Sequence, residues 1–224
     1  VSMNLLNGVT GQFSLGQAGF MTLGAYTYAI LTIPVSAKPS VYYLYGVADF
    51  LENISMPIVP ALITAGLVAA FFALLIGAPV LRLKSDYFAI ATLGFAEVVR
   101  IVVASSPLNK ITNGSLGLNS IPSFDSYYSI FVVVIICIAI MGLIKKSTYG
   151  RSFKAIRDDE VAAEAMGINL AKHKMLSFTV SSFFAGIGGA LLAMYLKAIS
   201  ATTFTISSAT YYILLMVVIG GMGS

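Results

Sequence analysis

The sequence predicts an all-α fold, a polytopic bundle of transmembrane helices with about six spans and one large cytoplasmic coupling loop. Of its 224 residues, 58% are hydrophobic and only 10% are charged, with a mean hydropathy of +0.91. Soluble domains carry about 25% charged residues. The apolar residues lie in runs close to the ~20 residues that a helix needs to cross a bilayer. Because these runs lack strand-like alternation, we expect helices.

Six apolar runs are candidate spans, and the third of them is interrupted by Glu97 and Arg100. They cover about residues 13–33, 57–81, 87–104, 127–144 and 175–196, and a last run that begins near residue 209. The segment before Phe13 is apolar but holds Asn4, Asn7 and two glycines. We expect a broken or re-entrant helix there, which a membrane tolerates only where protein or a cavity covers the backbone.

The ends of the chain also carry an expectation. The sequence begins with Val1, shows no signal peptide, and stops inside an apolar run. Both ends look cut, so we expect residues 1–224 to form a single transmembrane domain that lacks some of its spans.

The distribution of basic residues predicts the orientation, because cytoplasmic loops are enriched in Lys and Arg. With the 145–174 segment in the cytoplasm, that side holds nine basic residues: Arg82, Lys84 and seven in the segment itself. The other side holds Lys38, Lys110 and Lys197. This bias places the segments 38–53 and 105–126 outside.

Glycines cluster where helices are expected to meet, at Gly16, Gly19, Gly24, Gly186, Gly188 and Gly189. Small residues let helix backbones approach closely within a membrane. Close helix packing is the favoured interpretation, and a substrate path that needs exposed backbone is the alternative.

Two charges within a span require an explanation. Glu97 lies about 15 Å along the third span at 1.5 Å per residue, where each unpaired charge costs roughly 2.5–3.5 kcal/mol. The i, i+3 spacing puts Glu97 and Arg100 on one face, where they can neutralise each other. Together with Gln12 and Gln17 they are our candidate pathway or gate residues. The alternative is a structural ion pair, or an Arg100 that reaches toward the outer surface.

The sequence holds little catalytic chemistry. It has no P-loop motif for ATP, and the lone Cys137 supports neither a disulfide nor a metal site. His173 lies in the polar segment 145–174, outside the predicted spans. Paired buried carboxylates are lacking, which weakens the hypothesis of proton-coupled transport. We therefore expect no catalytic residue, metal, cofactor or nucleic acid partner, and either a passive conduit or a machine driven by another protein.

The segment 145–174 holds seven of the thirteen Lys and Arg, four of the nine Asp and Glu, and the single histidine. We expect Gly150 to break the chain, residues 151–156 to form a helical turn, and Asp158 or Asp159 to cap a short helix that ends at Gly167. Its small apolar face would be Val161, Ala162, Ala165 and Met166. Because a helix this short is unstable alone, docking in a groove of another protein is favoured over a solvated loop.

Four stretches resemble the permease subunits of branched-chain amino-acid ABC importers, of the LivM type. They are NLLNGVTGQFSLGQAGFMTLGAYTYA at 4–29, LRLKSDYFAIATLGFAEVVR at 81–100, TNGSLGLNSIP at 112–122, and GRSFKAIRDDEVAAEAMGINLAKHKMLSFTVSSFFAGIGGAL at 150–191. Such permeases carry a cytoplasmic Glu-Ala-Ala-x3-Gly loop that docks on the ATPase. Ala162, Ala163 and Gly167 match it, whereas Val161 stands at the Glu position and Glu160 lies one residue early.

The resemblance implies a non-catalytic, multi-pass subunit in a prokaryotic inner membrane. Its partners would be cytoplasmic ATP-binding subunits, a second homologous permease and an extracytoplasmic solute-binding protein. The contact with the ATPase would run from Arg157 through Asp158, Asp159 and Glu160 to Gly167. Leu, Ile and Val are the default substrates, while similar permeases move urea, short amides or other amino acids. A secondary transporter or channel without an ATPase and a purely structural subunit remain alternatives.

Overall fold

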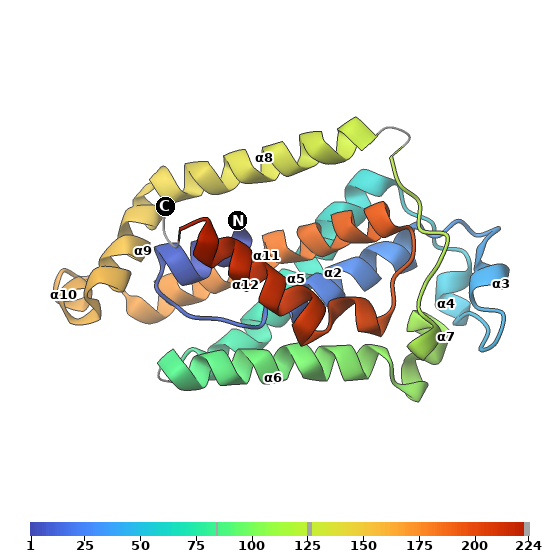
Figure 1. Ribbon diagram of the computed structural model, residues 1–224, viewed down its shortest axis with the longest axis horizontal. Coiled ribbons are helices and arrows are strands. Elements are labelled where there is room, and N and C mark those ends of the chain that lie inside the picture. The colour runs from blue at the N-terminus through green and yellow to red at the C-terminus, as the bar shows by residue number, and fades with distance from the viewer. Residues whose placement is uncertain (84, 125–126, 222–224) are drawn as a thin grey trace.

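The computed structural model describes residues 1–83, 85–124 and 127–221, which are mostly helical (Figure 1). The α-helices are α1 (Ser2–Asn4), α2 (Gln17–Thr32), α3 (Lys38–Val41), α4 (Asp49–Glu52), α5 (Ile58–Val80), α6 (Ser85–Val103), α7 (Asn109–Thr112), α8 (Tyr127–Lys146), α9 (Thr148–Asp158), α10 (Glu160–Ala165), α11 (Leu170–Leu196) and α12 (Tyr211–Ile219). Short π- and 3₁₀-helical turns are η1 (Leu5–Val9), η2 (Ser106–Leu108), η3 (Gly114–Leu116), η4 (Ala201–Phe204) and η5 (Ile206–Thr210). These residues form an all-α fold in which one isolated bridge joins Leu118 to Ile199.

Helices α2, α5 and α11 form the centre of the bundle (Figure 1). Glycine makes their close approach feasible. A Cβ on Gly24 would lie 2.1 Å from the carbonyl oxygen of Gly186, and one on Gly189 would lie 2.0 Å from that of Met21. The predicted close packing is confirmed at five of the six glycines, while a Cβ on Gly188 would meet no atom within 4 Å.

Three helices are long and apolar enough to cross a membrane: α5, α8 from Tyr128, and α11. A fourth span results if α6 and the bent continuation Ser106–Thr112, at 57°, count as one. The described residues therefore hold three or up to four candidate spans, where the sequence predicts about six. The two other candidates are shorter, because α2 has 16 residues and α12 has nine.

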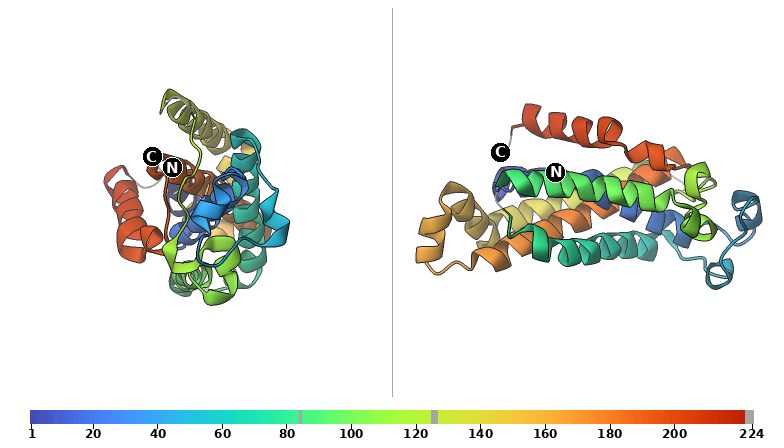
Figure 2. Two further views of the ribbon diagram at one scale, coloured as in Figure 1. Left: turned by 90° about the vertical axis from the view of Figure 1, so that its right-hand side faces the viewer. Right: turned by 90° about the horizontal axis from the view of Figure 1, so that it is seen from below.

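The molecule has two distinct ends. Helices α3, α4 and α7 lie at one end, and α9 and α10 lie at the other (Figures 1 and 2). The first end holds Lys38, Lys110 and the α11 terminus at Lys197. The second holds Arg82 and the polar segment, so the sequence's division of basic residues is matched in space. Lys84 lies outside the described residues.

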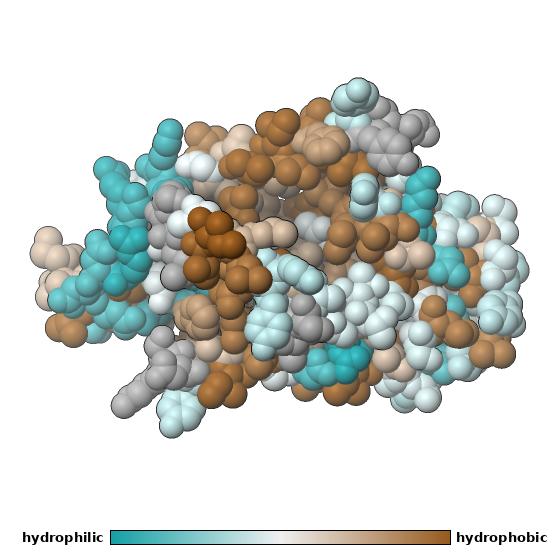
Figure 3. All heavy atoms as spheres, viewed as in Figure 1, coloured by the Kyte–Doolittle hydropathy of each residue, from teal (hydrophilic) through white to brown (hydrophobic). Residues whose placement is uncertain are grey.

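Helix α8 contacts α9 and α11 but leaves most of its surface uncovered. Many of its apolar side chains, among them Phe131 and Leu143, are exposed, and hydrophobic atoms gather over it in Figure 3. Hydrophilic atoms gather instead over the α9 and α10 end. An apolar flank beside a polar end is the surface expected of a protein that sits in a bilayer.

Candidate functional site

The polar segment folds as two helices, α9 and α10, followed by the first turns of α11. The break before α9 falls at Ser147 and not at the predicted Gly150. Ser147 Oγ accepts a hydrogen bond of 3.4 Å from the Gly150 amide and caps the helix. Gly150 lies inside the first turn, where a Cβ would come within 2.1 Å of the Lys145 carbonyl oxygen. Glycine therefore allows a tight corner without ending the helix, and α9 extends well beyond the expected residues 151–156.

Helix α10 has the predicted caps. Asp159 Oδ1 accepts hydrogen bonds from the amides of Val161 (2.8 Å) and Ala162 (3.1 Å). Gly167 has φ +84° and donates to Glu164 O at 2.9 Å, and Ile168 donates to Ala163 O at 3.0 Å. Because this pair of bonds closes the helix C-terminus in a Schellman arrangement, α10 is a defined six-residue helix.

The two faces of α10 differ. Val161 and Met166 are 79% and 84% exposed, and Ala162 and Ala165 are also exposed. Ala163 is 4% exposed and turns toward the rest of the chain. The predicted apolar face is therefore open to a partner, while Ala163 anchors the helix.

Helix α9 joins this unit to the start of the chain. Arg157 Nη1 donates a 3.0 Å hydrogen bond to Gly8 O, and its Nε and Nη2 bind Asp158 Oδ1 at 3.1 and 2.9 Å. A Cβ on Gly11 would lie 2.8 Å from Arg157 Cγ. Phe153, fully buried, packs in one cluster with Leu5 and Val9. Two kinds of contact, polar and apolar, thus connect α9 to η1.

The segment that α9 touches is a broken helix, as predicted. After η1 the backbone is non-helical until Gln17, and Gly11 has φ +75°. Asn7 bridges the break, since its Oδ1 accepts from Ser14 N at 3.0 Å and its Nδ2 donates to Ser14 O at 3.3 Å. The amide of Leu15 donates to Thr92 Oγ1 of α6 at 3.1 Å. These bonds explain why α2 begins at Gln17 and not near Phe13.

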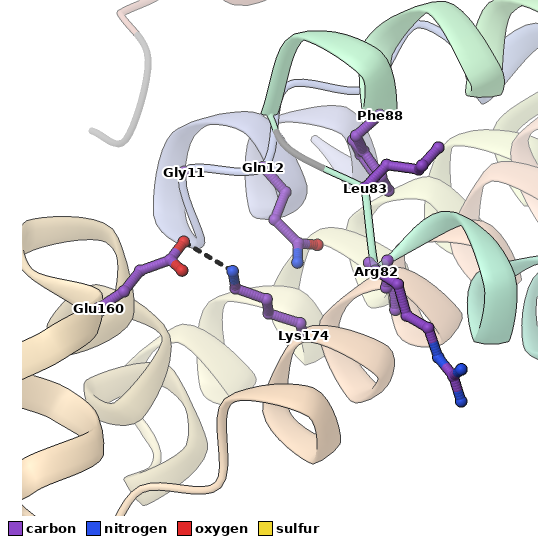
Figure 4. A pocket seen from close by; sticks show the side chains of 8 residues that line it. Gly11, Gln12, Arg82, Leu83, Phe88, Glu160 and Lys174 are labelled. Atoms are coloured by element: carbon purple, nitrogen blue, oxygen red, sulfur yellow. Dashed lines mark hydrogen bonds and ion pairs between the residues drawn. The ribbon is translucent and has the colours of Figure 1, made fainter.

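A cavity of about 400 Å³ lies between the broken helix, the α5–α6 turn and α10 (Figure 4). An ion pair of 2.6 Å between Glu160 and Lys174 stands on one side of it. Figure 4 shows Gln12 between Lys174 and the turn at Arg82. Gln12 Oε1 is buried with no hydrogen-bond partner in the described part of the chain. The cavity therefore offers one unpaired acceptor beside an ammonium group.

The other candidate pathway residues lie elsewhere. Gln17 is 2% exposed and donates through Nε2 to Ser181 Oγ at 2.8 Å. Arg100 Nε donates to Glu97 Oε1 at 3.0 Å, which confirms the ion pair, and both side chains are partly exposed on α6. The structure thus places Gln12, Gln17 and the Glu97–Arg100 pair at three separate sites. The sequence interpretation assigned no site role to Gly8, Gly11 or Lys174, although it placed both glycines in the expected broken helix.

Residues 1–224 match the family model described as branched-chain amino acid transport system / permease component. The chain belongs to this family. It is 31% identical to the high-affinity branched-chain amino acid transport system permease protein LivM of Escherichia coli and 30% identical to that of Salmonella typhimurium. Each comparison covers 100% of this chain and 56% of the relative, so the chain spans just over half the length of these relatives.

A more distant relative is the guanosine ABC transporter permease protein NupQ of Bacillus subtilis, 23% identical over 94% of this chain and 67% of the relative. No solved structure gives a significant match. Membership of the permease family and the apolar helices together make this chain an integral membrane permease component.

Proposed function

We propose that this chain is the membrane-spanning, non-catalytic subunit of an ATP-driven importer that moves branched-chain amino acids. The full-length family match supports the proposal, as do the names of the E. coli and Salmonella relatives. Residues 1–224 would form one transmembrane permease domain, paired with a second homologous permease. A solute-binding protein outside the inner membrane would deliver the substrate.

The exposed face of α10 carries this proposal. A six-residue helix is too short to be stable alone, yet here it has both caps and presents Val161 and Met166 outward. A cytoplasmic ATP-binding subunit would accept this face in a groove, as amphipathic helices are accepted elsewhere. Asp158, Asp159 and Glu160 then hold the helix in place, and Gly167 ends it.

The α9 contacts supply a route from that docking face into the membrane domain. Movement of α10 would shift Arg157 and Phe153, which hold Gly8, Leu5 and Val9. Discontinuous helices are where transporters place their substrate paths. We infer that ATP-driven movement of α10 reaches the broken helix through these contacts.

The division of charge supports the orientation. The end with α9 and α10 would face the cytoplasm, because nine basic residues belong to that side of the sequence and three to the other. The α3, α4 and α7 end would then face the binding protein.

The test replaces the apolar docking face with charge. Val161→Glu and Met166→Glu, each in the complete importer, should reduce labelled leucine uptake at least tenfold and abolish co-purification of the ATP-binding subunit. Leu44→Glu is the matched control, because Leu44 is an exposed apolar residue at the opposite end and should leave co-purification unchanged. Normal co-purification of both α10 variants would contradict the docking assignment.

Substrate and energy source have their own alternatives. The resemblance to a guanosine permease favours a nucleoside as the second substrate class, and urea, short amides or other amino acids would also fit the family. Each compound, added as an unlabelled competitor, would reduce labelled leucine uptake according to its affinity, and this ranks the alternatives. Uptake by the permease alone, without an ATP-binding subunit, would identify a channel or secondary transporter instead.

A further inference from the structure

Two apolar grooves meet beside Tyr149 on the outside of the bundle, away from the α10 docking face. They have volumes of about 480 and 560 Å³ and share Tyr149 and Leu176. The first is lined by Leu143, Ile144, Ser147, Tyr149, Phe153, Leu176 and Val180. The second is lined by Leu74, Tyr149, Lys172, His173, Met175, Leu176 and Thr179. Both grooves therefore open onto the flank formed by α5, α8, α9 and α11.

The lining changes from polar to apolar along α11. Lys172 and His173 stand in its first turn, Met175 and Leu176 follow, and Val180 lies about 12 Å beyond Lys172 at 1.5 Å per residue. The bilayer changes in the same way, from charged headgroups to hydrocarbon, over the interfacial layer at each face. This gradient fits an amphipathic ligand whose charged group lies at the α9 end and whose chains run toward the bundle centre.

The charge beside the grooves is positive. Lys172 is exposed within one groove, and Lys146, Arg151 and Lys154 are exposed on the adjoining α8 end and α9. Of the nearby acidic groups, Asp158 pairs with Arg157 and Glu160 pairs with Lys174. Juxtamembrane cations attract anionic headgroups by ~1 kcal/mol each, or roughly fivefold in binding.

The polar end of the second groove is also ordered. His173 Nδ1 lies 2.9 Å from Asn169 O, and because a carbonyl only accepts, Nδ1 carries the proton. The imidazole lies 6.2 Å from the Tyr149 ring and 6.4 Å from the Phe153 ring, between centroids. The held ring shapes one side of the groove, and the exposed Lys172 ammonium beside it is the group that can donate to a phosphate.

We propose that the two grooves bind one anionic phospholipid, with its phosphate at the Lys172 ammonium, beside His173, and one acyl chain in each groove. The separation of two apolar grooves by Tyr149 matches a headgroup that carries two chains. The proposal rests on the proposed function only in placing the chain in a bilayer with the α9 end at its surface. It does not depend on the ATP-binding subunit, because Val161 and Met166 line neither groove.

The test measures lipid selectivity of the complete importer in nanodiscs of phosphatidylcholine. Spin-labelled phosphatidylglycerol should associate roughly fivefold more strongly than spin-labelled phosphatidylcholine. Lys172→Glu should remove this preference, while Lys110→Glu, the same change at an exposed lysine of the opposite end, should preserve it. Leu176→Trp, which fills both grooves, should reduce immobilisation of either lipid, whereas Leu75→Trp on exposed α5 surface should not.

Each outcome decides the proposal. Equal association of the two lipids with the wild type, or a preference that survives both Lys172→Glu and Leu176→Trp, would overturn it. Displacement of the labelled lipid by glycerol phosphate alone would show a free-phosphate site and would also overturn it. Wild-type leucine uptake and co-purification in Leu75→Trp and Lys110→Glu keep these outcomes separate from failure of the importer itself.

Discussion

The two ends of the helix bundle differ in their buried polar side chains. At the α3, α4 and α7 end, Lys38 is 2% exposed and donates to the carbonyl oxygens of Leu51, Glu52 and Ile54. Asn113 Nδ2 donates to Val41 O at 3.0 Å and to Gly117 O at 2.8 Å. At the α9 and α10 end, most charged side chains are exposed. Asp49, Glu52, Lys110 and Lys197 are exposed at the first end as well, so the two ends differ in the buried, paired polar groups that Lys38 and Asn113 supply at the first.

The difference indicates which end is held more rigidly. Buried polar groups that bridge loops add rigidity when they are paired, and Lys38 and the Nδ2 atom of Asn113 do this at the α3 end. The α9 and α10 end contacts α8, α11 and η1, with Arg157 bonded to Gly8 O, Phe153 in the cluster with Leu5 and Val9, and Glu160 paired with Lys174. Because α10 has caps of its own and joins the bundle mainly through α9, the two helices suit the proposed transmission of movement from a docked partner.

The largest expected effect is on thermal stability, and it comes from removing the Lys38 bridge at the α3, α4 and α7 end. Lys38→Met removes the donor of three carbonyl oxygens, and buried groups left unpaired cost about 1–3 kcal/mol. We expect a fall of roughly 5–10 °C in the melting temperature of the detergent-solubilised protein. Lys110→Met, at an exposed lysine of the same end, should change it by less than about 2 °C. Equal shifts for the two variants would refute the view that this end is closed by Lys38.

The second prediction distinguishes the proposed route of movement, through the contact of Arg157 with Gly8, from the proposed docking face of α10. Arg157→Met removes a charge-assisted bond to Gly8, worth about 1.5–3 kcal/mol, so leucine uptake should fall roughly tenfold. The ATP-binding subunit should still co-purify, because the exposed face of α10 is unchanged. Arg151→Met is the control: its guanidinium binds only Thr148 of the same helix among the bonds found here, and uptake should persist. Loss of co-purification in Arg157→Met would make Arg157 part of the docking surface instead.

A smaller effect is expected at the cap of α10. Asp159→Ala removes two hydrogen bonds to helix amides, and such caps contribute about 0.5–2 kcal/mol. The affinity for the ATP-binding subunit, measured by titration in nanodiscs, should weaken between about twofold and thirtyfold. Asp159→Asn retains an accepting oxygen and should bind nearly as the wild type does. If Asp159→Asn were as weak as Asp159→Ala, the charge and not the cap would matter.

The parts that sequence could predict are those set by neighbours along the chain. Asp159 and Gly167 cap α10, and Glu97 pairs with Arg100, because each depends on spacings of a few residues. The contact of Arg157 with Gly8 joins positions 149 residues apart, and no local pattern encodes it. The inward turn of Ala163 likewise depends on which side of a six-residue helix faces the bundle. The predicted run 13–33 forms a helix only from Gln17, because the amides of Ser14 and Leu15 are bonded to Asn7 and Thr92 instead.

The smallest expected effect is a pH dependence of the stability that Lys38 contributes at the α3, α4 and α7 end. Burial lowers the pKa of Lys38 below its ordinary 10.5, and the nearby Glu52 carboxylate offsets this in part. In the window between the lowered pKa and 10.5, the unfolded chain binds more protons at Lys38 than the folded chain does. The Lys38 contribution to stability must therefore rise as pH increases through that window.

The measurement is the difference in melting temperature between the wild type and Lys38→Met, taken from pH 8 to 10.5. Subtraction removes the tyrosines and other groups that titrate in both proteins. The difference should grow with pH, while that between the wild type and Lys110→Met should stay flat. A difference that shrinks would mean that the ammonium form of Lys38 is favoured by folding, so that its three carbonyl partners outweigh the cost of burying its charge. The α3, α4 and α7 end would then be held by a charge-assisted contact, like the one that Arg157 makes with Gly8 at the other end.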